Sequence, residues 1–139
     1  MKDLLPSLIS TNSVEYIIHT IEIDEDIVVS VNQVIPIGLI INELVTNTIK
    51  HGLLENDINE IVIRGWFENG FYEIQYEDSG EGPSADMEPG SLDSLGMQLI
   101  VNLASQLKGR FLIIDTGAKR VQRLSFPEKD ALKHFSRAF

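Results

Sequence analysis

The first third of the chain carries two short apolar runs with a strand-like pattern. Residues 14–23 (VEYIIHTIEI) and 27–31 (IVVSV) are rich in β-branched side chains and alternate in part with polar ones, as half-buried strands do. The acidic triplet Asp24-Glu25-Asp26 separates the two runs, and carboxylates at this spacing are common in solvated turns. We therefore predict two strands joined by a turn, in which the acidic triplet holds no metal ion.

Helical spacing of apolar residues replaces this pattern in two segments. Pro36 suits the first turn of a helix and Gly52 suits the position just after its end, which predicts a helix over residues 36–51. Leucines recur at helical spacing over residues 94–108, and this pattern predicts a second helix. We expect Gly109 to stop that second helix.

A β-hairpin is predicted around Asn69-Gly70, because both residues tolerate positive φ. Four further strand-like runs flank this pair or follow the second helix, at residues 60–67, 71–77, 111–114 and 121–126. Strands and helices in this order predict an α+β fold, a two-layer α/β sandwich. Its mixed, mostly antiparallel sheet is covered on one face by helices.

Composition and charge narrow the class of protein. The 139 residues suit a single domain. Eleven Lys and Arg against 21 Asp and Glu give a net charge of −10, which argues against a nucleic-acid partner. The absence of cysteine fits a reducing cytoplasm. The longest apolar run, Val34–Ile41, is far shorter than the ~20 residues of a membrane span, so we expect no direct membrane contact.

The first predicted helix carries polar side chains on an otherwise apolar segment. At about 100° per residue, Glu43, Asn47, Lys50 and His51 share an arc of about 100°. A solvent-facing stripe explains this arc, and helix geometry alone slightly favours it. A binding site also explains it, because a buried carboxylate or amide needs partners or a wet cavity.

Two glycine-containing segments offer contacts for a ligand. The motif DSGEG at residues 78–82 opens a polar loop over residues 78–93, where glycines let backbone N–H groups approach a ligand closely. The motif SLGM at residues 94–97 begins the second predicted helix, where free N–H groups favour a phosphate. Each motif alone is more often a turn or a capped helix start.

Taken together and in this order, the three segments resemble the nucleotide site of one ATPase superfamily. It includes DNA gyrase, heat-shock chaperones, MutL mismatch repair proteins and sensor histidine kinases. NELVTNTIKHG (residues 42–52) looks like the N box of that superfamily, DSGEG like its first glycine box and SLGMQLI (residues 94–100) like its second. The wording is similar to sensor histidine kinases with a short lid and no phenylalanine-containing box. The resemblance covers about residues 14–127 and implies the Bergerat-type ATPase fold.

The resemblance also implies a site for ATP and Mg²⁺. Glu43 would act as the acid or base near the γ-phosphate, and Asn47 would bind Mg²⁺ through its side-chain oxygen. Asp78 would read the adenine amine, and residues 83–93 would form the lid. The further ATP-binding positions that the resemblance implies are Lys50, His51, Gly80, Gly82, Ser94, Leu95, Gly96 and Met97.

The chain departs from the resembling domains near its last strand. Such domains carry a Gly-Thr pair there, with the threonine helping to bind adenine, whereas this chain has Lys119-Arg120. Thr116-Gly117 lies just upstream and is one candidate substitute. A weaker nucleotide site is the other outcome.

The histidine that such kinases phosphorylate is the second departure. His19 lies on a predicted strand and His134 in the tail, so neither resembles a phosphoacceptor. Residues 1–10, with leucines at helical spacing, are interpreted as the remnant of a preceding dimerisation and phosphoacceptor helix. Residues 11–128 would then form the ATPase domain and residues 129–139 a tail.

The sequence therefore predicts the ATP-binding catalytic domain of a sensor histidine kinase, cytoplasmic or part of a larger, membrane-tethered sensor. Its partners would be a dimerisation and phosphoacceptor domain and a response regulator. A catalytically silent nucleotide-binding or docking module and an anti-sigma-type serine kinase remain alternatives. Glu43 and Asn47 favour an active kinase, and Lys119-Arg120 leaves room for the silent module.

Overall fold

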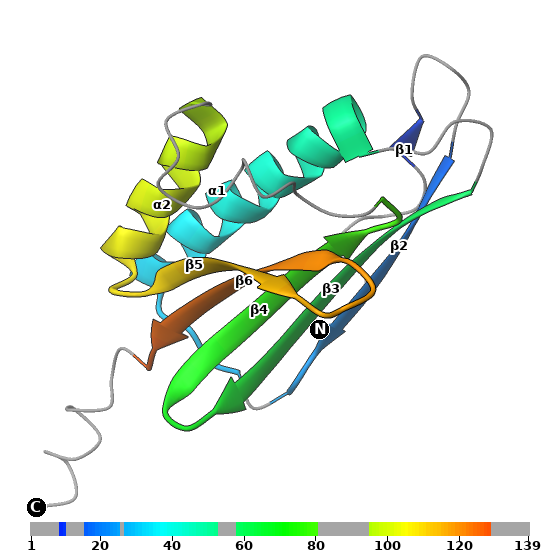
Figure 1. The fold of residues 1–139 in the computed structure, drawn as a ribbon. Coiled ribbons are helices and arrows are strands. Elements are labelled where there is room, and N and C mark those ends of the chain that lie inside the picture. Colours follow the sequence, from blue (N-terminus) through cyan, green and yellow to red (C-terminus); the bar gives the residue numbers. More distant parts are fainter. Residues whose placement is uncertain (1–8, 11–15, 26, 53–57, 81–94, 129–139) are drawn as a thin grey trace, which may run out of the picture.

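The computed structural model describes residues 9–10, 16–25, 27–52, 58–80 and 95–128. These residues form a curved sheet with helices on one side (Figure 1). The elements are β1 (Ile9–Ser10), β2 (Tyr16–Ile23), α1 (Val31–Asn47), the π-helical segment η1 (Thr48–Gly52), β3 (Asn59–Glu68), β4 (Phe71–Asp78), α2 (Leu95–Gln106), β5 (Arg110–Asp115) and β6 (Arg120–Pro127). In the described part of the chain, no helix is long and apolar enough to span a bilayer.

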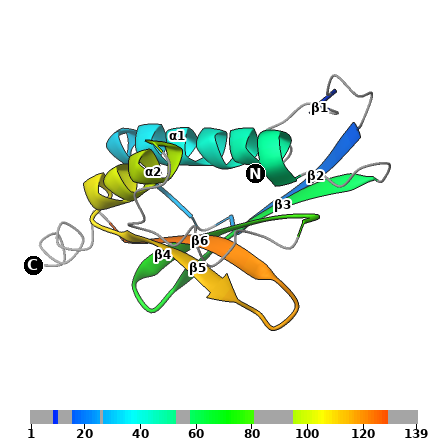
Figure 2. The ribbon, with the colours of Figure 1, turned by 45° about the horizontal axis from the view of Figure 1, so that its top comes forward.

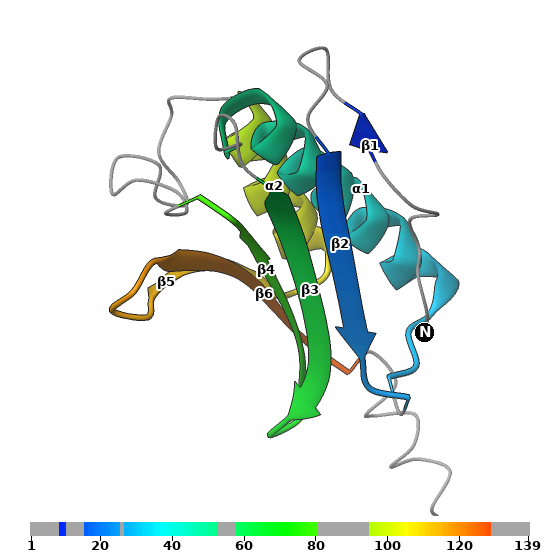
Figure 3. The same ribbon diagram turned by 90° about the vertical axis from the view of Figure 1, so that its right-hand side faces the viewer.

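The sheet is mixed, in the order β1-β2-β3-β4-β6-β5. β2 and β3 pair in parallel because α1 connects them across one face, and every other neighbouring pair is antiparallel. Figures 2 and 3 show both α-helices on the same face of the sheet, with the other face uncovered. The α+β, two-layer sandwich predicted from the sequence is therefore confirmed.

The hydrophobic core fills the space between the helices and the sheet. Alternate residues of β3 point into it, as the 2.0-residue period of a strand requires. Tyr76 and Phe126, among its largest members, are almost fully buried. The other members are Ile17, Ile40, Leu44, Ile61, Ile63, Tyr72, Met97, Ile100, Leu103, Ala104, Leu107, Phe111 and Leu124.

The N-terminus of α1 corrects the prediction of a strand at residues 27–31. Ser30 and Gln33 form a capping box: the Gln33 N–H donates to Ser30 Oγ at 3.3 Å, and the Ser30 N–H donates to Gln33 Oε1 at 3.0 Å. The helix therefore begins at Val31 and includes Pro36 in its interior, instead of beginning at Pro36. The cap and the packing of the helix on the sheet outweigh the local strand propensity of the β-branched residues.

The C-terminus of α1 widens into the π-helical segment η1 before Gly52. A π-helical turn closes i→i+5 hydrogen bonds, so the 100° rotation assumed for the whole helix does not hold for Lys50 and His51. Glu43 and Asn47 remain on the regular α-helical part. Helical structure therefore reaches Gly52, one residue beyond the predicted end.

The hairpin between β3 and β4 is confirmed. Asn69 and Gly70 have φ of 53° and 84°, the positive values that this two-residue turn needs. The strands predicted at residues 111–114 and 121–126 also form, as the longer β5 and β6. Local turn chemistry and alternation were sufficient for these elements because they pair with neighbours in sequence.

The stop of α2 is corrected by one residue. Lys108, with φ of 57°, takes the left-handed position assigned to Gly109. The Gly109 N–H donates to Ala104 O and the Lys108 N–H to Ser105 O, each at 2.9 Å, which is the Schellman pattern. Gly109 is needed for another reason: a Cβ atom there would overlap Ser125 O.

Several predictions concern residues outside the described ranges. These are most of the N-terminal piece, the loop and lid up to residue 94, and the tail over residues 129–139. Of the N-terminal piece, Ile9 and Ser10 are described, and they form strand β1 beside β2 instead of a helical turn.

Candidate functional site

The first part of the candidate site lies where α1 meets the start of α2. Glu43 and Asn47 are both half-buried and stand one turn apart, so they project from the same face of α1. The Glu43 carboxylate lies against the main chain of Gly96, where a Cβ atom would overlap Glu43 Oε1. The fold thus brings the polar stripe of α1 into contact with the second glycine segment.

The start of α2 presents its main chain to this place. The Leu95 side chain is 84% exposed, whereas the Met97 side chain is 2% exposed and belongs to the core. The Met97 side chain therefore packs in the core, and the start of the helix can offer a ligand its backbone N–H groups. Amides in the first turn of a helix have no intrahelical partner and favour an anion.

The second part of the site is a chain of hydroxyls between α1 and β4. Thr48 Oγ1 donates to Asp78 Oδ2 at 2.9 Å and lies 2.6 Å from Tyr76 Oη. A hydroxyl has one proton, so Thr48 accepts from Tyr76 while it donates to Asp78. The result is a directed relay, Tyr76 to Thr48 to Asp78, that joins the helix to the end of the strand.

Burial keeps this relay neutral at its starting point. Desolvation raises the pKa of Tyr76 well above its usual value, and the negative charge of Asp78 acts in the same direction. The hydrogen bond with Thr48 opposes these effects without cancelling them. Tyr76 therefore remains a proton donor to Thr48 throughout the physiological pH range.

Asp78 is held by its neighbours at the end of β4. Its Oδ1 accepts the Gly80 N–H at 3.0 Å, and the following Ser79 hydroxyl accepts the Glu60 N–H from β3 at 2.5 Å. Each carboxylate oxygen has two lone pairs, so Asp78 can accept further hydrogen bonds beyond those from Thr48 and Gly80. Such a fixed carboxylate can bind a ligand amine.

Lys119 reaches the same place from the turn between β5 and β6. Its Nζ donates to the main-chain oxygen of Asp78 at 2.5 Å and lies 3.4 Å from Glu77 Oε2. Lys119, the first residue of the pair that replaces the expected Gly-Thr, therefore contacts Asp78 in the folded chain.

The structure describes some of the remaining predicted positions and not others. Lys50 is exposed on η1, two residues after Thr48. His51 lies on η1, but its side chain is outside the description, as are Gly82 and Ser94. Glu43 on α1 and Thr48 at the start of η1 are five residues apart, about 7.5 Å along the helix axis, so the two parts of the site lie close together along one continuous helical segment.

The groups around Asn47 determine whether it can serve as a magnesium ligand. In the described ranges, no group of three or more His, Cys, Asp or Glu side chains is placed to hold a metal ion. The Asn47 amide oxygen and the Glu43 carboxylate are hard oxygen donors one turn apart. Such a donor set suits Mg²⁺, which proteins usually bind through one or two groups while phosphates and water supply the other ligands.

Comparison with protein-family models and with curated protein sequences finds no match. Solved structures do match. The histidine kinase domain of the blue-light activated histidine kinase from Erythrobacter litoralis has a TM-score of 0.69 at 21% identity, over 82% of this chain and 56% of that chain. Histidine kinase AdeS from Acinetobacter baumannii gives 0.64 at 15% identity, over 81% and 55%. The ATP binding domain of PrrB from Mycobacterium tuberculosis gives 0.56 at 17%, over 68% of each chain.

The chain has the fold of a histidine kinase catalytic domain. It spans little more than half the length of the first two solved chains. At these identities the likeness concerns the fold, and what the residues of this chain do must be argued from their own placement.

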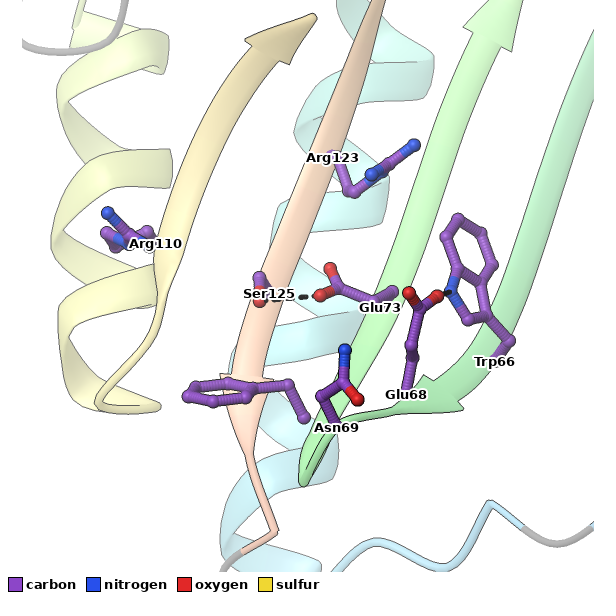
Figure 4. A pocket seen from close by; sticks show the side chains of 8 residues that line it. Trp66, Glu68, Asn69, Glu73, Arg110, Arg123 and Ser125 are labelled. Carbon is purple, nitrogen blue, oxygen red and sulfur yellow. Dashed lines mark hydrogen bonds between the residues drawn. The ribbon is translucent and has the colours of Figure 1, made fainter.

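A pocket of about 240 Å³ lies elsewhere on this histidine kinase fold, on the face of the sheet that the helices leave open (Figure 4). The Arg123 guanidinium stacks over the Trp66 ring at 5.0 Å, and Ser125 donates to Glu73 at 3.0 Å. The full lining is Trp66, Glu68, Asn69, Phe71, Glu73, Arg110, Arg123 and Ser125. This lining includes no residue predicted to bind nucleotide.

Sequence reasoning missed Thr48, Tyr76 and Lys119 as parts of the site in this histidine kinase fold. Thr48 lies outside the polar arc of the predicted helix, and it is buried, at 3% exposed. Its partners come from β4, about thirty positions away in sequence, so local pattern holds no signal for the relay. Lys119 stood out in the sequence as a departure, without any sign of what it contacts.

Proposed function

We propose that this chain is the ATP-binding catalytic domain of a sensor histidine kinase of the short-lid class. The contact of Glu43 with the main chain of Gly96 carries the proposal, because it joins two motifs that separately mean little. The hydrogen bond from Thr48 to Asp78 brings the third motif, DSGEG, to the end of the same helix. Three segments that are distant in sequence thus lie close together, where they would supply contacts for phosphate, metal and base.

Asp78 would recognise the base. Its carboxylate, held by Thr48 and Gly80, accepts hydrogen bonds and donates none, so it matches the exocyclic amine of adenine. A carbonyl oxygen at the same position of the purine would place its lone pairs against those of the carboxylate, with no hydrogen atom between them. Adenine nucleotides would therefore be preferred over purine nucleotides that carry a carbonyl there.

The phosphates would lie between η1 and the start of α2. Lys50 supplies an exposed positive charge, and the N–H groups of Gly96 and Met97 open a helix whose dipole favours anions. His51, Gly80, Gly82, Ser94 and Leu95 complete the proposed nucleotide site. Bound Mg²⁺, held by Asn47 and phosphate oxygens, would neutralise phosphate charge.

Glu43 would act on the incoming nucleophile. In transfer to a histidine, a nitrogen–phosphorus bond forms, the bond from the γ-phosphorus to the bridging oxygen breaks, and ADP leaves. Glu43 would orient the imidazole and accept its proton. Phosphoryl transfer depends mainly on positioning and charge neutralisation, which this set of residues can supply.

The acceptor histidine would come from a dimerisation and phosphoacceptor domain, with a response regulator receiving the phosphoryl group next. The chain covers 37% of a longer solved chain of the blue-light activated histidine kinase, which leaves room for such a domain in a kinase of that kind. The proposed setting is the cytoplasm, either free or attached to a membrane-tethered sensor.

Calorimetric titration with a non-hydrolysable ATP analogue tests the proposal. The native chain should bind the analogue, and more tightly with Mg²⁺ than without it. Asn47→Ala should lose the gain that Mg²⁺ brings, because the metal loses its side-chain ligand. Asn32→Ala, at an exposed position of the same helix, is the matched control and should behave as the native chain.

Two results would contradict this function. Absence of binding to the native chain with Mg²⁺ present rejects the nucleotide site as a whole. Equal gains from Mg²⁺ in the native chain and in Asn47→Ala reject the metal role of Asn47 alone.

A further inference from the structure

The turn between β5 and β6 is rigidly built. The Thr116 N–H and the Thr116 hydroxyl both donate to Lys119 O at 2.9 Å, and the Lys119 N–H returns a hydrogen bond to Thr116 Oγ1 at 3.3 Å. Gly117, with φ of 89°, takes the left-handed corner, and its N–H donates to Asp115 Oδ1 at 2.8 Å. These hydrogen bonds therefore fix the main chain of Lys119 independently of its side-chain contacts.

The Lys119 side chain crosses from this turn to the end of β4. It is 26% exposed, and its ammonium contacts the Asp78 carbonyl oxygen and the Glu77 carboxylate. Glu77 in turn pairs with Arg64 at 2.7 Å, so the carboxylate is held between two cations. The Lys119 ammonium thus donates a hydrogen bond to Asp78 and forms an ion pair with Glu77, the preceding residue of β4.

This contact lies on the side of Asp78 where β4 has no partner from β6. Pairing of β4 with β6 ends at Tyr76 and Gln122, whereas pairing of β4 with β3 continues to Asp78 and Ile61. On the β6 side, the Lys119 ammonium therefore supplies the hydrogen bond to the Asp78 carbonyl that the ladder does not. A charged donor makes a stronger bond than the neutral N–H of a ladder.

We propose that Lys119 is a positioning residue for base recognition, which fixes the Asp78 main chain so that its carboxylate stays aimed at the purine amine. This inference rests on the proposed function. Asp78 is held from two directions: Thr48 and Gly80 fix its carboxylate, and Lys119 fixes its carbonyl. The Lys119-Arg120 departure from a Gly-Thr pair then changes how the base site is supported, and does not abolish it.

The selectivity between ADP and inosine diphosphate tests this role. The two ligands have the same phosphates and ribose, and inosine diphosphate has a carbonyl where ADP has the amine that Asp78 would bind. We expect Lys119→Met to weaken ADP binding about tenfold, the value of one hydrogen bond to a charged group, here that of the purine amine to the Asp78 carboxylate. The affinity for inosine diphosphate should stay nearly unchanged. The ratio of the two dissociation constants should fall accordingly.

Two further variants separate positioning from general charge and from folding. Lys119→Arg keeps a cationic donor and should restore much of the ratio. Lys108→Met removes the same charge from an exposed residue at the end of α2 and should leave the ratio as in the native chain. Thermal unfolding of each variant shows that it is folded, which we expect because Lys119 is partly exposed.

The outcomes are distinguishable. An unchanged ratio in Lys119→Met overturns the inference and leaves the proposed function intact. Equal weakening of both ligands also overturns it, because that result indicates a phosphate contact or a general structural role. A native chain that binds neither nucleotide overturns the proposed function and this inference with it.

Discussion

The two faces of strand β4 solve different physical problems. On the face covered by the helices, Tyr76 is buried and begins a relay of hydroxyls that ends on Asp78. On the open face, Gln75 and Glu77 meet guanidinium groups in partly exposed contacts. Figure 3 shows the strand between the helix layer and solvent. The same strand therefore carries buried hydroxyls that lead to a carboxylate on one side and partly solvated charged contacts on the other.

This difference determines what each face contributes. A buried hydroxyl that loses its partner keeps its desolvation cost, whereas a partly exposed ion pair returns to water at little cost. The covered face should therefore govern both stability and ligand binding, and the open face neither. Lys119 is the exception, because it lies on the open side and acts on the residue that the relay fixes.

The largest effect is expected from Thr48→Val. The substitution keeps the shape of the side chain and leaves the Tyr76 hydroxyl and Asp78 Oδ2 without their shared partner. We expect a loss of about 2 kcal/mol in the free energy of unfolding, measured by urea denaturation, and weaker ADP binding. The control is Thr46→Val, whose hydroxyl donates to Asn42 O on the helix surface; it should change stability by under about 0.5 kcal/mol.

If Thr48→Val and Thr46→Val cost the same, the relay adds nothing to the stability of the covered face. The contrast between the two faces of β4 would then be lost.

Tyr76→Phe should have a smaller effect, about 1 kcal/mol at neutral pH, because one hydrogen bond is removed and the ring stays packed. Burial raises the pKa of Tyr76 in the folded chain above that in the unfolded chain, which is about 10. Its stabilising contribution is therefore complete below pH 10 and lost as pH rises further, when the unfolded chain releases this proton. Urea denaturation between pH 7 and 11 should show a shallower alkaline decline for Tyr76→Phe than for the native chain. Parallel declines would mean that burial does not keep the phenol protonated.

Gly96→Ala and Gly38→Ala compare two glycines on the helix layer. A Cβ atom at Gly96 would displace the Glu43 carboxylate, so binding of the ATP analogue should weaken although a flexible side chain can move at little cost in stability. At Gly38 a Cβ atom meets nothing within 4 Å. Gly38→Ala should therefore raise stability by about 0.5 to 1 kcal/mol through helix propensity and leave binding unchanged. Equal binding by both variants would contradict the placement of phosphates beside Gly96.

The smallest effect is expected from Arg64→Met on the open face. Arg64 pairs with Glu77 at 2.7 Å and with Glu22 at 3.5 Å, but its side chain is partly exposed and that of Glu22 is mostly exposed. We expect a loss under about 1 kcal/mol that shrinks further at high salt. A loss comparable to that of Thr48→Val would show that the open face contributes as much as the covered one.

Sequence pattern was sufficient where structure is local. The hairpin at Asn69-Gly70 depends on two residues that accept positive φ, and it forms where predicted. The strand predicted at residues 27–31 failed because valines favour strands, while the Ser30–Gln33 capping box and burial against the sheet favour a helix. Propensity over five residues cannot outweigh a cap and the packing of a whole helix.

The site divides in the same way. Glu43, Asn47 and Asp78 could be proposed from the sequence, since each lies in a short characteristic motif. The partners of Thr48 and Lys119 could not, because their contacts depend on how β4 and the last hairpin meet. Contacts between residues distant in sequence follow from the fold, and a single sequence contains no local trace of them.

An amide chemical-shift titration with ADP and Mg²⁺ tests the central claim most directly, because it locates the bound nucleotide on one face of the sheet or the other. We predict saturable shifts concentrated in residues 43–50, 78–80 and 95–97, with little change around Trp66 and Arg123 in the pocket on the open face. Shifts centred on that pocket, with residues 78–80 unmoved, would contradict the account.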